Sequence, residues 1–118
     1  MTYVDGFLLP VPKKNLAAYK RIATRAGKIW REHGALDYKE CVGDDLKVKM
    51  VLPFTKAVKL KAGEVPVFSF IVFKSRAHRD KVNKKVMSDP RLKSMASEPM
   101  VFDMKRMVYG GFKTLVEV

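Results

Sequence analysis

The chain is poor in the residues that metal centres and disulfide-stabilised folds require. Its 118 residues include one cysteine, Cys41, and two histidines, His33 and His78. A lone cysteine excludes an intrachain disulfide, which suits a reducing compartment. Two histidines in separate segments, without paired cysteines, do not give the spacing of a zinc site. We therefore expect no metal and no cofactor.

Long hydrophobic runs are also missing. The longest apolar run covers residues 67–73, far short of the roughly 20 residues that span a bilayer. Near the start, Phe7-Leu8-Leu9 is apolar, but Pro10 follows and no basic residue precedes it, so it is unlike a signal peptide. These absences predict a soluble cytoplasmic protein without a membrane partner. The length predicts a single domain over residues 1–118.

Acidic residues are few relative to basic ones. Lysine and arginine number 24 against 12 aspartates and glutamates, giving a formal net charge of +12. Residues 13–33 hold seven basic side chains and one acid, and residues 46–63 hold five lysines and no acid. Such charge attracts polyanions, including nucleic acids. A solvated basic surface accounts for the same charge, so the charge alone does not identify a partner.

Hydrophobic periodicity predicts alternating strands and helices. Strands are expected over residues 2–11, 36–42, 65–74 and 105–118, and helices over residues 15–33 and 76–87. Between them, residues 47–52 alternate like a short strand, and Pro53 could begin a helical turn. Gly110-Gly111 indicates a bulge or a close backbone approach in the last strand. The order predicts an α+β fold, the ferredoxin-like split βαβ sandwich, with two helices on one face of a four-stranded antiparallel sheet.

The strand over residues 67–73 is apolar on both faces. Alternate side chains point to opposite faces, which places Val67, Ser69, Ile71 and Phe73 on one face and Phe68, Phe70 and Val72 on the other. Two helices can cover only one face of the sheet. The second face therefore needs a partner, a ligand or a nucleic acid as cover.

RNA binding is one alternative, because an RNA recognition motif stacks bases on strand aromatics. The run from Phe68 to Phe73 shows the aromatic frame of that motif, and Tyr3 to Phe7 loosely matches its companion strand. However, Pro66 and Val67 stand where the motif has a basic residue and a glycine. Nucleic-acid binding is therefore the less favoured reading.

Motifs along nearly the whole chain resemble the bacterial domain-of-unknown-function family 1428. They are Tyr3-Val4-Asp5-Gly6-Phe7, Trp30-Arg31-Glu32-His33-Gly34-Ala35-Leu36, Glu40-Cys41-Val42-Gly43-Asp44-Asp45, Ser75-Arg76-Ala77-His78-Arg79-Asp80 and Lys105-Arg106-Met107-Val108-Tyr109-Gly110-Gly111-Phe112. The resemblance implies a dimeric α+β barrel, in which two sheets pack open face to open face. Phe68, Phe70 and Val72 are then the expected dimer-face residues. The superfamily includes cofactor-free monooxygenases, isomerases and haem-binding enzymes, but the family has no established activity.

Polar and aromatic side chains on otherwise apolar strands are the candidates for a ligand pocket. Tyr38, Glu40, Arg106 and Tyr109 form the leading set. Tyr38 and Glu40 share one strand face, where they border a cavity or Glu40 pairs across the sheet. We therefore expect a homodimer that binds or converts a small molecule. A structural or regulatory dimer without catalysis is the other alternative.

Three further residues are weaker candidates. Asp5 lies between two aromatics on its strand face, which suggests a buried pair or a pocket acid, with Arg106 as its expected partner. Cys41 is the only thiol, and a thiol nucleophile needs cations or a helix N-terminus nearby. His78 could act as a general base, or it packs beside Val82.

Overall fold

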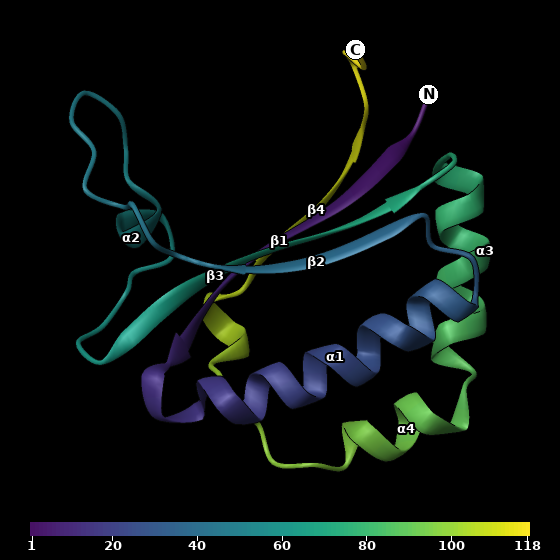
Figure 1. Cartoon of the computed structure of the whole chain (residues 1–118), viewed down its shortest axis with the longest axis horizontal. Coiled ribbons are helices and arrows are strands. Elements are labelled where there is room, and N and C mark those ends of the chain that lie inside the picture. Colours follow the sequence, from purple (N-terminus) through teal and green to yellow (C-terminus); the bar gives the residue numbers. More distant parts are fainter.

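Four strands form one antiparallel sheet in the computed structural model, which describes residues 1–118 (Figure 1). The strands are β1 (Tyr3–Pro12), β2 (Asp37–Val42), β3 (Glu64–Phe73) and β4 (Val108–Lys113), in the spatial order β2-β3-β1-β4. The helices are α1 (Leu16–Glu32), α2 (Phe54–Ala57), α3 (Arg76–Met87) and α4 (Pro90–Ala96), and the 3-10 turns are η1 (Lys13–Asn15) and η2 (Met104–Arg106). This is the ferredoxin-like α+β fold that the sequence predicted.

The three longer helices, α1, α3 and α4, lie on the same side of the sheet, with α4 beyond α1 (Figure 1). Strand pairing aligns Tyr3 with Phe73 and Leu9 with Val67, so the alternate residues of β1 and β3 meet on that face. Two buried clusters result. One contains Tyr3, Ile29, Ala35, Ile71, Phe73, Val82 and Val86, and the other contains Leu9, Val11, Tyr19, Ala23 and Val67. Burial of these side chains is the main favourable term in folding.

Local signals in the sequence set the ends of the helices. Ser75 caps α3 by accepting a hydrogen bond from the backbone N–H of His78 at 3.1 Å. Asp89 caps α4 in the same way, and Pro90 occupies the first turn, where its missing N–H costs nothing. After α1, Gly34 adopts a φ of 114°, which favours glycine.

No helix combines the length and the apolar character that a membrane crossing requires.

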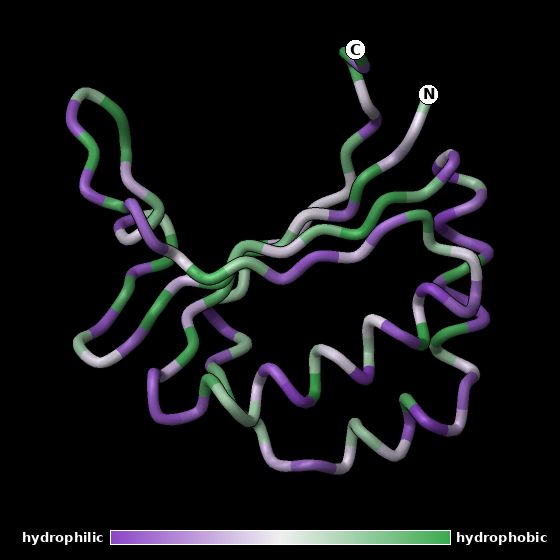
Figure 2. Tube along the Cα trace, in the orientation of Figure 1, coloured by the Kyte–Doolittle hydropathy of each residue, from purple (hydrophilic) through white to green (hydrophobic).

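The insertion between β2 and β3 differs from the prediction. The expected strand over residues 47–52 is absent, and only the four-residue helix α2 forms there. Met50 has a positive φ of 72°, which interrupts the extended backbone, and no neighbouring strand pairs with this segment. Residues 43–63 instead project from the sheet as an arm in which hydrophobic and hydrophilic residues alternate (Figure 2).

The last strand is shorter than predicted and contains no bulge. Residues 104–106 form η2, and pairing with β1 begins at Val108. The register then runs without interruption through Gly110 and Gly111. The predicted close approach is real, because a Cβ atom on Gly111 would collide with the hydroxyl of Tyr3.

Candidate functional site

A cavity of about 550 Å³ lies between the sheet and the helices. All four strands contribute one wall, and α1, α3, α4 and η2 contribute the others. Most of its lining is apolar, including Trp30, Met87, Met95, Phe102, Met104 and Met107. Because methionine side chains are flexible and polarisable, this wall can adapt to ligands of different shape.

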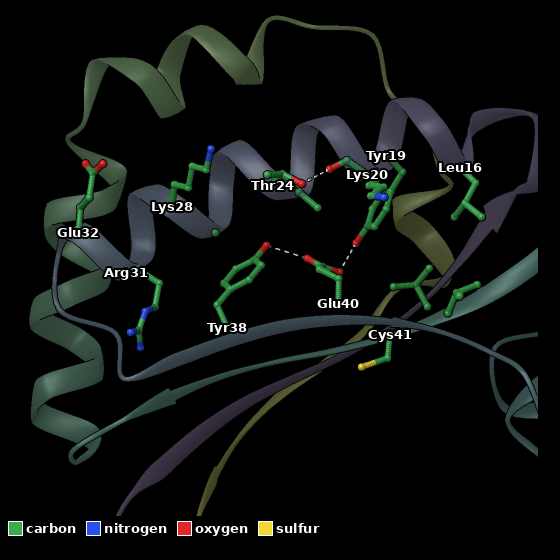
Figure 3. Close-up of a pocket in the computed structure, with 14 residues that line it drawn as sticks. Leu16, Tyr19, Lys20, Thr24, Lys28, Arg31, Glu32, Tyr38, Glu40 and Cys41 are labelled. Carbon is green, nitrogen blue, oxygen red and sulfur yellow. Dashed lines mark hydrogen bonds between the residues drawn. The ribbon is translucent and has the colours of Figure 1, made fainter.

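Three of the lining residues, Tyr19, Tyr38 and Glu40, form a tyrosine–glutamate cluster. Figure 3 shows the hydrogen bonds that join them. The hydroxyl of Tyr19 on α1 donates to one Glu40 carboxylate oxygen at 2.6 Å, and that of Tyr38 donates to the other at 2.7 Å. These are the lengths of charge-assisted bonds to an ionised carboxylate. Burial raises the pKa of both tyrosines, and the charge of Glu40 acts in the same direction. Both phenols therefore remain protonated donors.

Close packing against α1 positions Tyr38. Its ring lies beside Gly27, where a Cβ atom would be 2.8 Å from two ring carbons. The ring centroid of Tyr38 is also 6.3 Å from that of Trp30, whose indole N–H donates to Asn83 at 3.0 Å. Gly27 thus leaves the space that Tyr38 needs to reach Glu40.

A second polar cluster contains Asp5, Arg79 and Tyr109. Asp5 is 1% exposed, and Arg79 on α3 donates to it at 2.7 Å and to the Tyr109 hydroxyl at 3.1 Å. Arg79 also lies 4.9 Å from the centroid of the Tyr3 ring. Burial, aided by the charge of Asp5, raises the pKa of Tyr109. Asp5 and Tyr109 line the cavity, so this cluster offers it a second polar contact.

Of the leading candidates, Tyr38, Glu40 and Tyr109 line the same cavity, but Arg106 does not. Arg106 lies in η2, before the ladder of β4 begins, and it makes two hydrogen bonds to Glu64, at 2.7 and 2.6 Å. The predicted Asp5–Arg106 pair is wrong, because Arg79 from α3 occupies that position. The Arg106 guanidinium lowers the pKa of Glu64 to about 2.

The two remaining candidates lie outside the cavity. Cys41 is exposed, and its sulfur points away from α1 (Figure 3). His78 accepts a hydrogen bond at Nδ1 from the backbone N–H of Lys74 at 2.9 Å, and its ring packs on Phe73. Burial and neighbouring lysines lower the pKa of His78. No three side chains among His, Cys, Asp and Glu converge as metal ligands would.

Sequence reasoning missed the site roles of Tyr19 and Arg79. Tyr19 is a buried residue of α1, and the hydroxyl of a buried tyrosine needs a hydrogen-bond partner. That requirement could have suggested an acceptor such as Glu40 on the sheet. No sequence signal connects Arg79 to Asp5, because 74 residues separate them.

A groove of about 780 Å³ lies on the other side of the tyrosine–glutamate cluster, between α1 and the edge strand β2 (Figure 3). Four residues, Tyr19, Ala23, Tyr38 and Glu40, line both the groove and the cavity. The cluster therefore separates the two hollows.

Comparison with known proteins identifies the family. The chain is 44% identical over 117 residues to Uncharacterized protein YbaA of Escherichia coli (strain K12), with 99% of each chain covered. The protein of the same name from Shigella flexneri matches equally well. The structure of Rv0793 from Mycobacterium tuberculosis superposes with a TM-score of 0.60 at 12% identity, covering 99% of this chain and 98% of that one. It therefore shares the α+β fold of this chain. The family described as "Protein of unknown function (DUF1428)" matches residues 2–104, and the chain belongs to this family.

Proposed function

We propose that the protein binds a small molecule in the cavity between its sheet and helices. The observation that carries this proposal is the convergence of two polar clusters on one largely apolar cavity of about 550 Å³. Ligand sites in proteins have this character, with volumes of about 300–1,000 Å³ and a few polar groups that orient the ligand. The apolar wall would hold the body of the ligand, and the clusters would orient its polar groups.

The tyrosine–glutamate cluster offers two kinds of polar contact. Tyr19 and Tyr38 can redirect their O–H groups to a carbonyl or hydroxyl of the ligand, and Glu40 can then accept a hydrogen bond from it. If the ligand is converted, Glu40 is the first residue to test as a proton acceptor, since it lies in the cavity wall.

We also propose that the protein is a homodimer, because one face of the sheet carries exposed apolar side chains. Phe68 on β3 is 44% exposed, and Val108 and Phe112 on β4, beyond the intervening strand β1, are 51% and 63% exposed. Phe70 and Val72 lie on the same face of β3. A second copy of this face would remove these side chains from water and complete a barrel.

Trp30 provides the test of ligand binding, because it is the only tryptophan and lines the cavity. A collection of hydroxylated and carboxylated aromatic fragments is titrated against the protein. A ligand of the cavity should change Trp30 emission and raise the melting temperature. Ser69→Leu, which fills the cavity from β3, should abolish both responses.

The matched control is Ser94→Leu, at an exposed position of α4 that does not line the cavity. This variant should bind as the native protein does. If Ser69→Leu and Ser94→Leu bind the same fragments equally well, the ligand lies elsewhere and the proposal is wrong.

A further inference from the structure

The groove between α1 and β2 has a chemistry different from that of the cavity. Its floor is apolar and includes Leu16, Ala23, Val42 and Val67, whereas Lys20, Lys28 and Arg31 lie along its helical side. Residues 20, 24, 28 and 31 follow one another at intervals of three or four on α1, which places them on one flank of the helix. The groove thus combines an apolar floor with a row of cations.

The two carboxylates of the groove already have partners. Glu32 pairs with Arg91 at 2.6 Å, and Glu40 accepts hydrogen bonds from two tyrosines. Lys20 and Lys28 take part in none of the ion pairs of the protein. Their positive charges are therefore available to an anion at the mouth of the groove.

The charge of Glu40 decides how such an anion would lie. Glu40 stands at the inner wall, between groove and cavity. A negative group close to Glu40 would be repelled, whereas one near Lys20 and Lys28 would be attracted. An anion with an apolar body would therefore keep its charged head at the mouth and direct its body inward, toward Tyr38.

Passage from the groove to the cavity requires Tyr38 to move. Its hydroxyl makes one side-chain hydrogen bond, to Glu40, and Tyr19 would still hold the other carboxylate oxygen if that bond broke. Rotation of the Tyr38 side chain would then join the groove to the cavity, because these residues separate the two hollows.

We propose that the groove is the entrance to the cavity and selects amphipathic organic anions, namely small carboxylates with an apolar body. The inference rests on the proposed ligand-binding function and adds the class of ligand. Lys20 and Lys28 bind the carboxylate, and the apolar body of the ligand occupies the groove floor and the cavity. The Tyr38 side chain rotates to let the body pass from one to the other.

Three probes that share a phenylpropyl group and differ in their polar end group test this selectivity. They are 3-phenylpropanoate, 3-phenylpropan-1-ol and 3-phenylpropan-1-amine, titrated against the full chain by Trp30 fluorescence and calorimetry. An exposed ion pair contributes modestly, so two lysines should make the carboxylate bind roughly tenfold tighter than the alcohol. The ammonium compound should bind most weakly. Added salt should weaken the binding of the carboxylate but not that of the other two probes, since salt screens the attraction between exposed charges.

Charge-matched variants assign the effect to the groove. The double variant Lys20→Gln/Lys28→Gln should bind the carboxylate only as tightly as it binds the alcohol. Its affinity for the alcohol should equal that of the native protein. Lys84→Gln/Lys85→Gln, which removes the same charge from exposed positions on α3, should keep the native preference.

The outcomes separate the two proposals. If the alcohol binds as tightly as the carboxylate, or if both double variants respond alike, anion selection by the groove is wrong although the cavity still binds ligand. If none of the three probes changes Trp30 emission or releases heat, both the anion inference and binding of such ligands in the cavity fail.

Discussion

At the residue scale, the site depends on one glycine as much as on its polar side chains. Gly27 lies within α1, where glycine costs about 1 kcal/mol relative to alanine. The ring of Tyr38 occupies the space that a side chain at this position would fill. Glycine at position 27 therefore weakens the helix but lets the Tyr38 hydroxyl reach Glu40.

Gly27→Ala should lower the melting temperature, although alanine favours helix, because its Cβ atom would lie 2.8 Å from the Tyr38 ring. In a Tyr38→Ala background the same substitution should instead stabilise the protein by about 1 kcal/mol, since only the helix propensity remains. Urea denaturation of the four proteins gives the coupling between the two sites. Stabilisation of the native background by Gly27→Ala would show that the Tyr38 ring does not confine this position.

At the scale of the elements, ion pairs join segments that the sheet does not connect. Arg106 in η2 pairs with Glu64 at the start of β3 and also donates to the carbonyl oxygen of Lys59 at 3.1 Å. These contacts join the end of the arm, just before β3, to the segment that precedes β4. Similarly, Asp89 before α4 lies 2.9 Å from His33 at the end of α1.

The Glu64–Arg106 pair should make stability depend on pH. The pKa of Glu64 is lowered from 4.5 to about 2 in the folded protein, so the folded state favours the ionised carboxylate. Its contribution is complete above pH 4.5 and is lost as the pH falls through about 2. The difference in melting temperature between the native protein and Glu64→Gln should therefore narrow from pH 5 to pH 2.

Glu98→Gln is the control, because this carboxylate lies in an exposed ion pair with Arg25 and such pairs contribute little. Its melting temperature should follow that of the native protein across the range. A constant difference between the native protein and Glu64→Gln would mean that the Arg106 pair does not stabilise the ionised carboxylate.

At the scale of the whole molecule, the helices leave one face of the sheet uncovered (Figure 1). A contiguous apolar patch on a protein surface marks a site of interaction with another molecule. The arm reaches part of this face, since Phe54 of α2 lies 6.1 Å from Phe68 between ring centroids. Phe112 and Val108 stay exposed on β4.

Light scattering at micromolar concentration should therefore give about twice the chain mass of 13.4 kDa. Phe70→Lys should shift the mass to that of the monomer, because a buried lysine without a partner would oppose association. Leu115→Lys changes an 88% exposed side chain near the C-terminus and should leave the mass unchanged. A monomeric native protein would contradict the dimer proposal.

The sequence predicted local structure well wherever a local signal existed. The helices predicted over residues 15–33 and 76–87 agree with α1 and α3 to within one residue at each end. The prediction failed for residues 47–52, because alternation produces a strand only when another strand lies alongside. The choice of Tyr38, Glu40 and Tyr109 as pocket candidates rested on residue type and strand position alone.

The sequence by itself determined the order of the elements, the fold class and the two-sided apolar character of β3, because hydrophobic periodicity and capping act between near neighbours. Only the tertiary structure decided which charges meet. Arg79 rather than Arg106 reaches Asp5, and Tyr19 joins Tyr38 on Glu40. Side-chain pairing across a sheet and its helices depends on distances in space that spacing along the chain does not contain.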